Sequence, residues 1–254
     1  IYYEASFADA LELGRSRNWR YVEVRSGSAP SAGAMPSITY LEHRLRLLPE
    51  TQAFRDLKPE TRTALRKAGR CGVTIEKATD REAIVEYYRL HCLTRRKHGV
   101  PPQPFRFFDR VRHHVIAAGN GDVFLARHQG KVVAAAVFFR WGRQVIYKYG
   151  ASDHTRLQLR ANNLLFWEAI NHYRARGFEE LHLGRTNSDE TGLRRFKNGW
   201  GSVENVIDYH RYDLRNNAYV SGVDAPNSRM TNLFRRLPES VNRLIGNCVY
   251  RHFG

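Results

Sequence analysis

Cysteine is scarce in this chain of 254 residues, and its placement excludes the common cysteine-based scaffolds. The three cysteines are far apart in the sequence, and none of them belongs to a CxxC pair. Disulfide frameworks and structural zinc sites need paired or closely spaced cysteines, so we predict neither, and the sequence indicates no metal. Unpaired thiols are typical of a reducing compartment. The cysteines are Cys71, Cys92 and Cys248.

Long apolar runs are missing as well. A membrane-spanning helix needs about 18 or more consecutive apolar residues, and the sequence contains no such stretch. No signal peptide is recognisable either. The chain starts at Ile1 instead of a methionine, so we expect that residues preceding it are absent from this sequence. We predict a cytoplasmic protein.

Acidic residues are outnumbered by basic ones. The chain has 41 lysines and arginines against 25 aspartates and glutamates, which gives a formal net charge of +16. A field of this sign attracts polyanions, namely RNA, phosphorylated carriers or anionic lipid headgroups. A generally basic proteome would give the same composition, and charge by itself names no reaction.

Residues 1–49 are too few to close a core of their own. Apolar residues from Phe7 to Leu11 have helical spacing and predict a short helix. The segment Ser26–Ser37 is rich in Gly, Ser and Pro, which is typical of a loop. Residues 38–48 then alternate polar and apolar side chains, which predicts a strand with one apolar face. We interpret this part as the end of a larger N-terminal domain.

From Pro59 onwards, helical and strand patterns alternate. Pro59 and Gly72 bound a short helix, and a strand follows it. Thr79 and Glu82 have the spacing of a capping box and predict a second helix, which ends near Gly99. Three consecutive strands come later, and the middle one is apolar almost throughout, as expected for a strand covered on both faces. The further elements predicted are a helix over Arg110–Ala118, strands over Val123–Arg127, Val132–Arg140 and Gln144–Gly150, a helix over Asn162–Arg176, a strand over 181–186, a loop, and a strand over Val203–Leu214.

Four sequence segments follow one another between residues 55 and 214. They are TRTALRKAGRCGVTIEKA, HCLTRRKHGVPPQPFRFF, VIYKYGASDHTRLQLRANNLLFWEAINHYRARGFEELHLGRT and LRRFKNGWG. In this order they resemble the FemAB-like peptidyltransferases of the GNAT superfamily, and the last segment is similar to that family's F-K-x-x-[FW]-G signature. The resemblance implies an α/β GNAT fold with a mixed, mostly antiparallel sheet. It also implies that 1–49 ends a first GNAT-like domain, 50–215 forms the transferase domain, and 216–254 forms a linker and tail.

The resemblance further implies an acyl- or aminoacyl-transferase. In such enzymes an amine of a cell-wall or polysaccharide precursor attacks an activated carbonyl, usually the ester of an aminoacyl-tRNA. The two substrates must be held in attack geometry, and the oxyanion of the intermediate must be stabilised. No cofactor is implied with certainty, because aminoacyl-tRNA or acyl-CoA would act as a donor substrate.

Lys197 is the first candidate for catalysis, because it matches the signature lysine of the family. Its ammonium would donate to the developing oxyanion or to the leaving 3′ oxygen, and a solvated loop lysine is the alternative. Phe196 beside it would stack on the terminal adenine of tRNA or pack in the core. Trp200 of the same signature is a further candidate for substrate binding.

Two strands supply more candidates for substrate binding. Tyr147 and Tyr149 alternate with their neighbours in a predicted strand, so we expect both side chains on one face. A phenol there would position substrate, with core packing as the alternative. Arg185 and Thr186 end the next predicted strand, and strand ends often line a ligand cleft.

Basic side chains are expected to bind the phosphates of the donor. A GNAT enzyme that uses acetyl-CoA has a Q/R-x-x-G-x-G/A turn before a helix, where backbone N–H groups cradle the pyrophosphate. The corresponding segment here, ASDHTRLQLRANN, has no glycine, which favours aminoacyl-tRNA over CoA. The predicted phosphate- or RNA-binding residues are Arg62, Arg66 and Arg70 in one helical stripe, Arg95 and Arg96 in the next helix, and Arg156 and Arg160 in the glycine-free segment.

Two other functions stay open at the level of sequence. One is a CoA-dependent N-acyltransferase that acts on a sugar amine. The other is a non-catalytic module that binds RNA or another anionic polymer, in which no single residue would be decisive. Co-purified CoA would favour the first of these, and a binding affinity that falls gradually as basic residues are removed would favour the second.

The tail beyond Leu214 has a pattern of its own. Asn216–Asn232 is polar and is expected to be a linker, and Pro238 suits a helix start. The helix either packs against the body of the enzyme or holds it at the inner face of the membrane, where a phosphorylated or lipid-linked precursor would be the acceptor. Its apolar stripe consists of Val241, Leu244, Ile245, Cys248 and Val249, with arginines around it.

Overall fold

The computed structural model describes residues 2–25, 29–31, 33–222 and 228–250. The chain divides into two compact units, which are described separately. Unit 1 consists of Ile1–His43, Arg185–Arg195 and Val203–Ala225, and unit 2 consists of Arg44–Gly184, Phe196–Ser202 and Pro226–Gly254.

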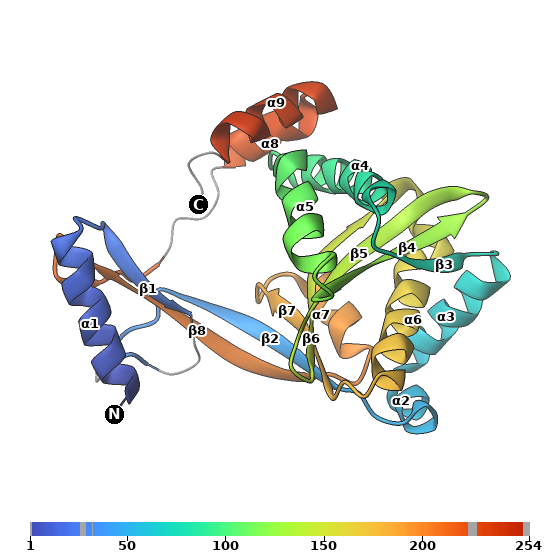
Figure 1. Ribbon diagram of the computed structural model, residues 1–254, viewed down its shortest axis with the longest axis horizontal. Coiled ribbons are helices and arrows are strands. Elements are labelled where there is room, and N and C mark those ends of the chain that lie inside the picture. Colours follow the sequence, from blue (N-terminus) through green and yellow to red (C-terminus); the bar gives the residue numbers. More distant parts are fainter. Residues whose placement is uncertain (1, 26–28, 32, 223–227, 251–254) are drawn as a thin grey trace. The chain divides into compact units, whose positions relative to one another are not determined.

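A five-stranded part of the sheet forms the centre of unit 2 (Figure 1). The first four strands pair antiparallel in chain order, and the last pairs parallel with the fourth. The predicted mixed and mostly antiparallel α/β sheet is thereby confirmed. The strands are β3 (Thr74–Ala78), β4 (Gly121–His128), β5 (Lys131–Trp141), β6 (Gln144–Ser152) and β7 (Glu180–Thr186).

Helices cover both faces of this sheet. On one face lie α3 (Pro59–Arg70) and α6 (Ala161–Ala175), and on the other lie α4 (Arg81–His98) and α5 (Phe105–Val111) (Figure 1). Alternate residues of β5 therefore point into two separate cores, so that Phe138 packs with α6 and Val137 packs with α4. The strand is buried on both sides, as its apolar sequence predicted.

Two helix ends show where the predicted boundaries succeed and fail. Gly99 has a left-handed conformation, with φ of 68°, and ends α4 as predicted. The predicted capping box at Thr79 is wrong by one residue, because Asp80 is the N-cap and its carboxylate accepts the Ala83 N–H at 2.8 Å. The predicted helix over Arg110–Ala118 starts earlier, as α5, and continues as a π-helical turn over Arg112–Ile116.

Unit 1 combines segments from distant parts of the sequence. The strand β1 (Tyr21–Arg25) pairs antiparallel with β8 (Val203–Asp213), and β8 also pairs with the short β9 (Ala218–Tyr219). The helix α1 (Tyr2–Ser16) packs on these strands through Phe7, whose ring contacts Tyr212 and Tyr219. The chain passes between the two units within β2 (Ile38–Arg46), within β7 and within α7 (Thr191–Asn198).

Two segments predicted to lack regular structure contain helices. The predicted loop before β8 holds α7, and the predicted linker holds β9 and the start of α8 (Ser228–Arg236). α7 has only Leu193 and Phe196 as apolar residues, which is too few to define a helical period. The remaining helices of the described residues are α2 (Glu50–Asp56), a 3-10 helix over His154–Leu159 and α9 (Glu239–Val249). None of the helices in the described part of the chain combines the length and the apolar character needed to cross a membrane.

Candidate active site

The strands β6 and β7 separate after a short paired stretch. They pair at three positions, the last of which joins Ile146 to His182, although β6 continues to Ser152 and β7 to Thr186. Gly184 follows this point in β7 with φ of 74°, a conformation that favours glycine. Because β6 does not pair with this part of β7, the carbonyl of Gly184 is available to a side chain.

Lys197 uses that carbonyl. Its Nζ donates to Gly184 O at 2.8 Å, and the lysine is buried, with an exposed fraction of 2%. The backbone carbonyl of Lys197 in turn accepts the Ser202 hydroxyl at 3.0 Å. A buried ammonium needs hydrogen-bond partners to offset its loss of hydration. The reading of Lys197 as a solvated loop residue is therefore wrong, since α7 carries this ammonium to the point where β6 and β7 part.

A bulge in β6 places the two candidate tyrosines on opposite faces. Tyr149 pairs with Val137 and Tyr147 pairs with Phe138, so Lys148 is an extra residue in the ladder. The expectation that both tyrosines share one face is therefore wrong, because the extra residue reverses the alternation. Tyr147 packs in the α6 core, and Tyr149 packs in the α4 core.

Tyr147 belongs to an aromatic group next to Lys197. Its ring lies 4.6 Å from the ring of Phe166, which lies 5.1 Å from Phe196 and 5.7 Å from Trp200. Burial raises the pKa of Tyr147 to about 12, so the phenol is neutral near pH 7. Trp200 is 2% exposed, while Phe196 is half-buried. Of the two signature aromatics, Phe196 is the one that a ligand can reach.

Phe196 lines a cavity of about 180 Å³ between the end of β6 and the start of α6. Arg156 and Arg160, both predicted to bind phosphate, line the same cavity. The first residues of α6 lie in its wall, and the N-terminus of a helix favours an anion. The complete lining is Val133, Ala134, Ser152, Asp153, Arg156, Leu157, Arg160, Ala161, Asn162, Asn163 and Phe196.

A neighbouring cavity of about 420 Å³ shares Arg156 with the first. Arg89 of α4, together with His128 and Lys131 at the turn between β4 and β5, adds basic character, and Glu86 and Asp153 are its acids. Sequence analysis did not select Arg89 or Lys131, since neither lies in a motif. The pairing of β5 with β6, in which Ala134 lies opposite Ser152, brings the Lys131 turn to the end of β6.

The other predicted site residues lie elsewhere. Arg185 and Thr186 fall in unit 1, where the Arg185 guanidinium lies 4.4 Å from the ring centre of Tyr40 and Thr186 is buried. Arg95 donates to the Tyr250 hydroxyl and Arg96 to the carbonyl of Arg235. The stripe on α3 lies on the opposite face of the sheet from α4, and consists of Arg62, Arg66 and Arg70.

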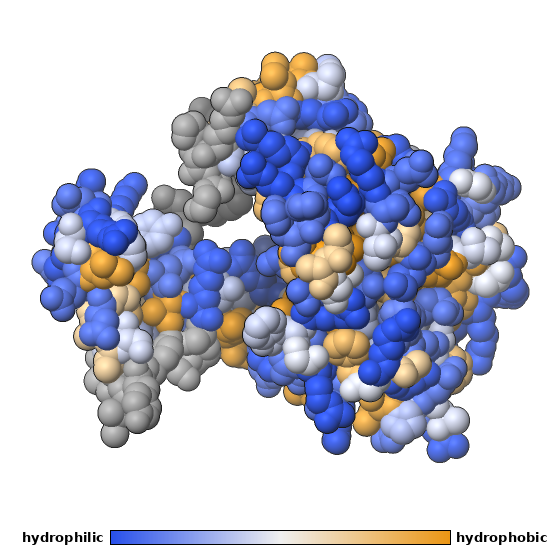
Figure 2. All heavy atoms as spheres, viewed as in Figure 1, coloured by the Kyte–Doolittle hydropathy of each residue, from blue (hydrophilic) through white to orange (hydrophobic). Residues whose placement is uncertain are grey.

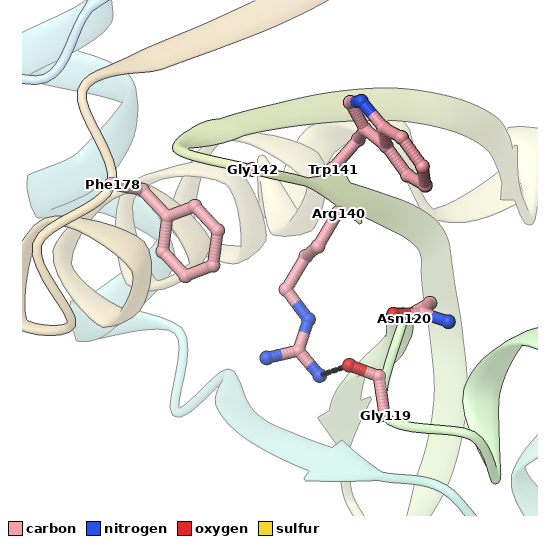
Figure 3. Close-up of a pocket in the computed structure, with 6 residues that line it drawn as sticks. All are labelled: Gly119, Asn120, Arg140, Trp141, Gly142 and Phe178. Atoms are coloured by element: carbon pink, nitrogen blue, oxygen red, sulfur yellow. Dashed lines mark hydrogen bonds between the residues drawn. The ribbon is translucent and has the colours of Figure 1, made fainter.

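A further pocket, of about 510 Å³, lies at the opposite end of β6 and is lined in part by the turn between β5 and β6 (Figure 3). Figure 3 shows the Arg140 side chain extending between Phe178 and Gly119. Its guanidinium donates to Gly119 O and lies 3.4 Å from a carboxylate oxygen of the buried Asp122. Arg140 is thus held within the fold, and we place the active site at the Lys197 end instead.

Residues 55–198 match the protein family described as acetyltransferase (GNAT) domain, a span of more than half the chain. The chain belongs to the GNAT acetyltransferase-domain family. The predicted GNAT fold and the predicted class of enzyme, an acyl- or aminoacyl-transferase, are thereby confirmed. The non-catalytic alternative is not retained.

Known relatives of this GNAT protein include Fem-type enzymes, which confirms the predicted FemAB-like resemblance. The UDP-N-acetylmuramoylpentapeptide-lysine N(6)-alanyltransferase of Weissella viridescens is 24% identical over 112 residues, or 42% of this chain and 32% of the relative. The crystal structure of FemX has a TM-score of 0.60 at 15% identity and covers 79% of this chain and 68% of its own. A tandem GNAT protein from the clavulanic acid biosynthesis pathway has a TM-score of 0.53 at 12% identity, covering 83% and 69%. The chain thus spans about a third of the curated relative.

The turn before α6 departs from a glycine-rich GNAT turn in a defined way. Arg160, the residue directly before the helix, has φ of 57°, a left-handed conformation that is uncommon for residues other than glycine. The turn is stabilised from its start, where the Asp153 carboxylate accepts the N–H of Thr155 at 2.9 Å. This GNAT domain therefore has a 3-10 helix over His154–Leu159 before α6, with Arg156 within it and Arg160 directly after it.

Proposed function

We propose that this protein transfers an aminoacyl group from an aminoacyl-tRNA to an amine of a cell-wall precursor. The observation that carries the proposal is the buried Lys197 ammonium, held on Gly184 O where β6 and β7 separate. The alanyltransferase of Weissella viridescens, by its name, transfers alanine to a lysine of a UDP-linked muramoyl pentapeptide, which supports both the reaction and the acceptor class.

The reaction is an aminolysis. The acceptor nitrogen attacks the ester carbonyl, a C–N bond forms, and the ester C–O bond to the 3′ oxygen breaks. The nitrogen loses one proton and the leaving oxygen gains one. The Lys197 ammonium would donate one of its N–H groups to the oxyanion as the negative charge develops. One such donor contributes about 3–4 kcal/mol to the stability of the transition state.

Other residues would hold the donor. Phe196 borders the cavity next to Lys197 and offers a ring face to the terminal adenine. Arg156 and Arg160 line the same cavity and would bind the terminal phosphates of tRNA. The arginine stripe on α3 would bind phosphates further along the tRNA chain. Tyr147 and Trp200 would fix the position of Phe166 and Phe196, and so act by positioning.

We further propose that residues 1–49 end a first GNAT-like domain, that 50–215 form the second, and that 216–254 form a tail. The fold shared with a tandem GNAT protein supports this arrangement. The acceptor would be a phosphorylated or lipid-linked precursor, and the enzyme would work in the cytoplasm.

The test measures transfer by the purified protein in two parallel reactions. One contains a pool of labelled aminoacyl-tRNA and the other a pool of labelled acyl-CoA, and both contain muramoyl pentapeptide precursors as acceptors. We expect label from aminoacyl-tRNA to appear on the precursor amine, and Lys197→Ala to slow the transfer by about 10²–10³. Lys67→Ala, which removes an exposed lysine of α3, is the matched control. Transfer from acyl-CoA alone would reject aminoacyl-tRNA as the donor.

A CoA-dependent N-acyltransferase of a sugar amine is the second candidate, because the matching family is described by acetyl transfer. The cavity beside α6 could bind a pyrophosphate through Arg156 and Arg160. The absence of glycine in residues 151–163 weighs against it, since backbone approach to a pyrophosphate usually needs glycine. CoA retained through purification and detected by mass spectrometry would favour this candidate.

A further inference from the structure

The helices α8 and α9 are attached to α4 by polar and small residues. Arg95 donates to the Tyr250 hydroxyl at 2.8 Å, and the Arg243 guanidinium lies 5.4 Å from the ring centre of Tyr88. Gly246 approaches the Pro102 carbonyl so closely that no side chain would fit. Asn242 donates to the carbonyl of Phe234 at 2.8 Å and joins the two helices. These contacts fix which side of α9 faces the protein.

The predicted apolar stripe of α9 therefore faces away from α4. The residues buried in α9 are Asn242 and Gly246, whereas Leu244 is 64% exposed. Figure 2 shows hydrophobic side chains at the top of the molecule, where α9 lies. The large exposed apolar residues of the two helices are Met230, Leu233, Val241, Leu244 and Val249. The expected packing of α9 on the body is present, but through its other side.

Exposed apolar side chains on two neighbouring helices indicate a binding surface, because a soluble monomer rarely leaves such residues together in water. Arginines accompany them. Arg235 and Arg236 are exposed on α8, against one acidic residue in the described part of the two helices, Glu239. The surface thus combines apolar side chains with positive charge, which is the composition of helices that lie in a membrane interface.

We propose that α8 and α9 dock this protein on an anionic membrane surface. The apolar side chains would enter the headgroup region, and the arginines would bind acidic headgroups. A second copy of the chain is a less suitable occupant, because a two-fold contact would bring the arginines of both copies together and each chain carries a net charge of +16. This proposal is independent of the transfer reaction.

The test is co-sedimentation with vesicles of phosphatidylcholine alone and with vesicles in which about one third is phosphatidylglycerol. We expect the protein to bind the second kind and not the first. The double variant Leu233→Glu/Leu244→Glu should weaken binding by at least about ten-fold, since it replaces two apolar contacts by charges that anionic lipid repels. Arg235→Gln/Arg236→Gln should weaken binding by about five-fold for each arginine.

Matched controls separate the surface from general charge. Leu13→Glu/Val85→Glu is the control for Leu233→Glu/Leu244→Glu. It introduces the same charge at two apolar helix residues that lie outside α8 and α9 and are 45% and 44% exposed. Arg66→Gln/Arg70→Gln removes two arginines of α3 and is the control for Arg235→Gln/Arg236→Gln. Circular dichroism establishes that each variant is folded. The proposal fails if the wild-type protein does not bind phosphatidylglycerol vesicles, or if the controls lose as much binding as the test variants. It also fails if sedimentation shows a dimer that Leu244→Glu dissociates. None of these outcomes depends on whether transfer occurs.

Discussion

Replacement of Lys197 by alanine is the sharpest test of the site. The lysine is 2% exposed and donates to Gly184 O at 2.8 Å, next to the point where the pairing of β6 with β7 ends. Loss of one preorganised oxyanion donor costs about 3–4 kcal/mol in the transition state, so kcat should fall by about 10²–10³. KM for the donor should change much less, because the interaction forms mainly in the transition state.

The same substitution also affects stability, and the two effects must be separated. It removes the partner of the Gly184 carbonyl, which costs about 1–3 kcal/mol if that carbonyl stays buried. For a chain of this length, 1 kcal/mol lowers Tm by about 2–4 °C. Leu90→Ala is a suitable control, since Leu90 is fully buried in the α4 core and its truncation costs about 2–5 kcal/mol without contact to Lys197.

The assay combines steady-state transfer kinetics with thermal unfolding of wild type, Lys197→Ala, Lys197→Arg and Leu90→Ala. We expect Leu90→Ala to lower Tm while kcat stays near the wild-type value at temperatures where it is folded, and Lys197→Arg to recover part of kcat. The reasoning is refuted if Lys197→Ala retains wild-type kcat. It is equally refuted if kcat falls in proportion to Tm in both variants.

Three further predictions concern other features of the same unit. Arg156→Gln/Arg160→Gln should reduce the slope of log binding constant against log salt concentration for tRNA by about 0.7 per lost phosphate contact. The control Arg106→Gln/Arg110→Gln should leave this slope unchanged. Equal slopes for the two double variants in filter-binding titrations would contradict the assignment of the cavity to phosphate binding. Gly150→Ala should destabilise the fold by about 1–3 kcal/mol, because its Cβ would collide with the Tyr147 hydroxyl, and Tyr147→Phe should restore part of that loss in a double-mutant cycle measured by urea unfolding. His91 is held neutral by burial, which lowers its pKa to about 4, while Gln103 and Tyr87 bond its two nitrogens. As the pH falls, the unfolded chain therefore binds a proton at this histidine before the folded chain does, so the free energy of unfolding should fall by about 3 kcal/mol between pH 6.5 and pH 4. This decrease should be smaller in His91→Gln, and it should be the same as in wild type in the control His113→Gln, which changes an exposed histidine.

The predicted elements with many apolar residues at regular spacing agree with the structure. β5 is apolar throughout because two cores cover it, and α6 has a clear apolar face. α7 and α8 were missed because they are short and polar, and their position is set by contacts that only the fold creates. The cap at Asp80 shows that two adjacent residues can both suit an N-cap, and local geometry chooses between them.

The site was predicted in part. The match to a family signature selected Lys197 and Phe196, whose roles stay predictions, and the structure gives the lysine a burial and a partner that no spacing rule contains. Gly184 and His182 were not selected, because a strand sequence does not reveal where its pairing ends. The roles of Arg156 and Arg160 stay predictions, supported by the cavity that both residues line.

The extra residue in β6 has a consequence for how this site can change over time. Up to Tyr147 the odd-numbered residues of β6 face the α6 core, and after Lys148 the odd-numbered residues face the α4 core. Deletion of Lys148 would remove the bulge, while Tyr149 and every later residue of β6 would keep their partners on β5 and therefore the core that they face. A change of one residue in length at this point could thus occur without changing which residues line the cleft beside α6. Comparisons among relatives should therefore align β6 in two halves, one on each side of Lys148.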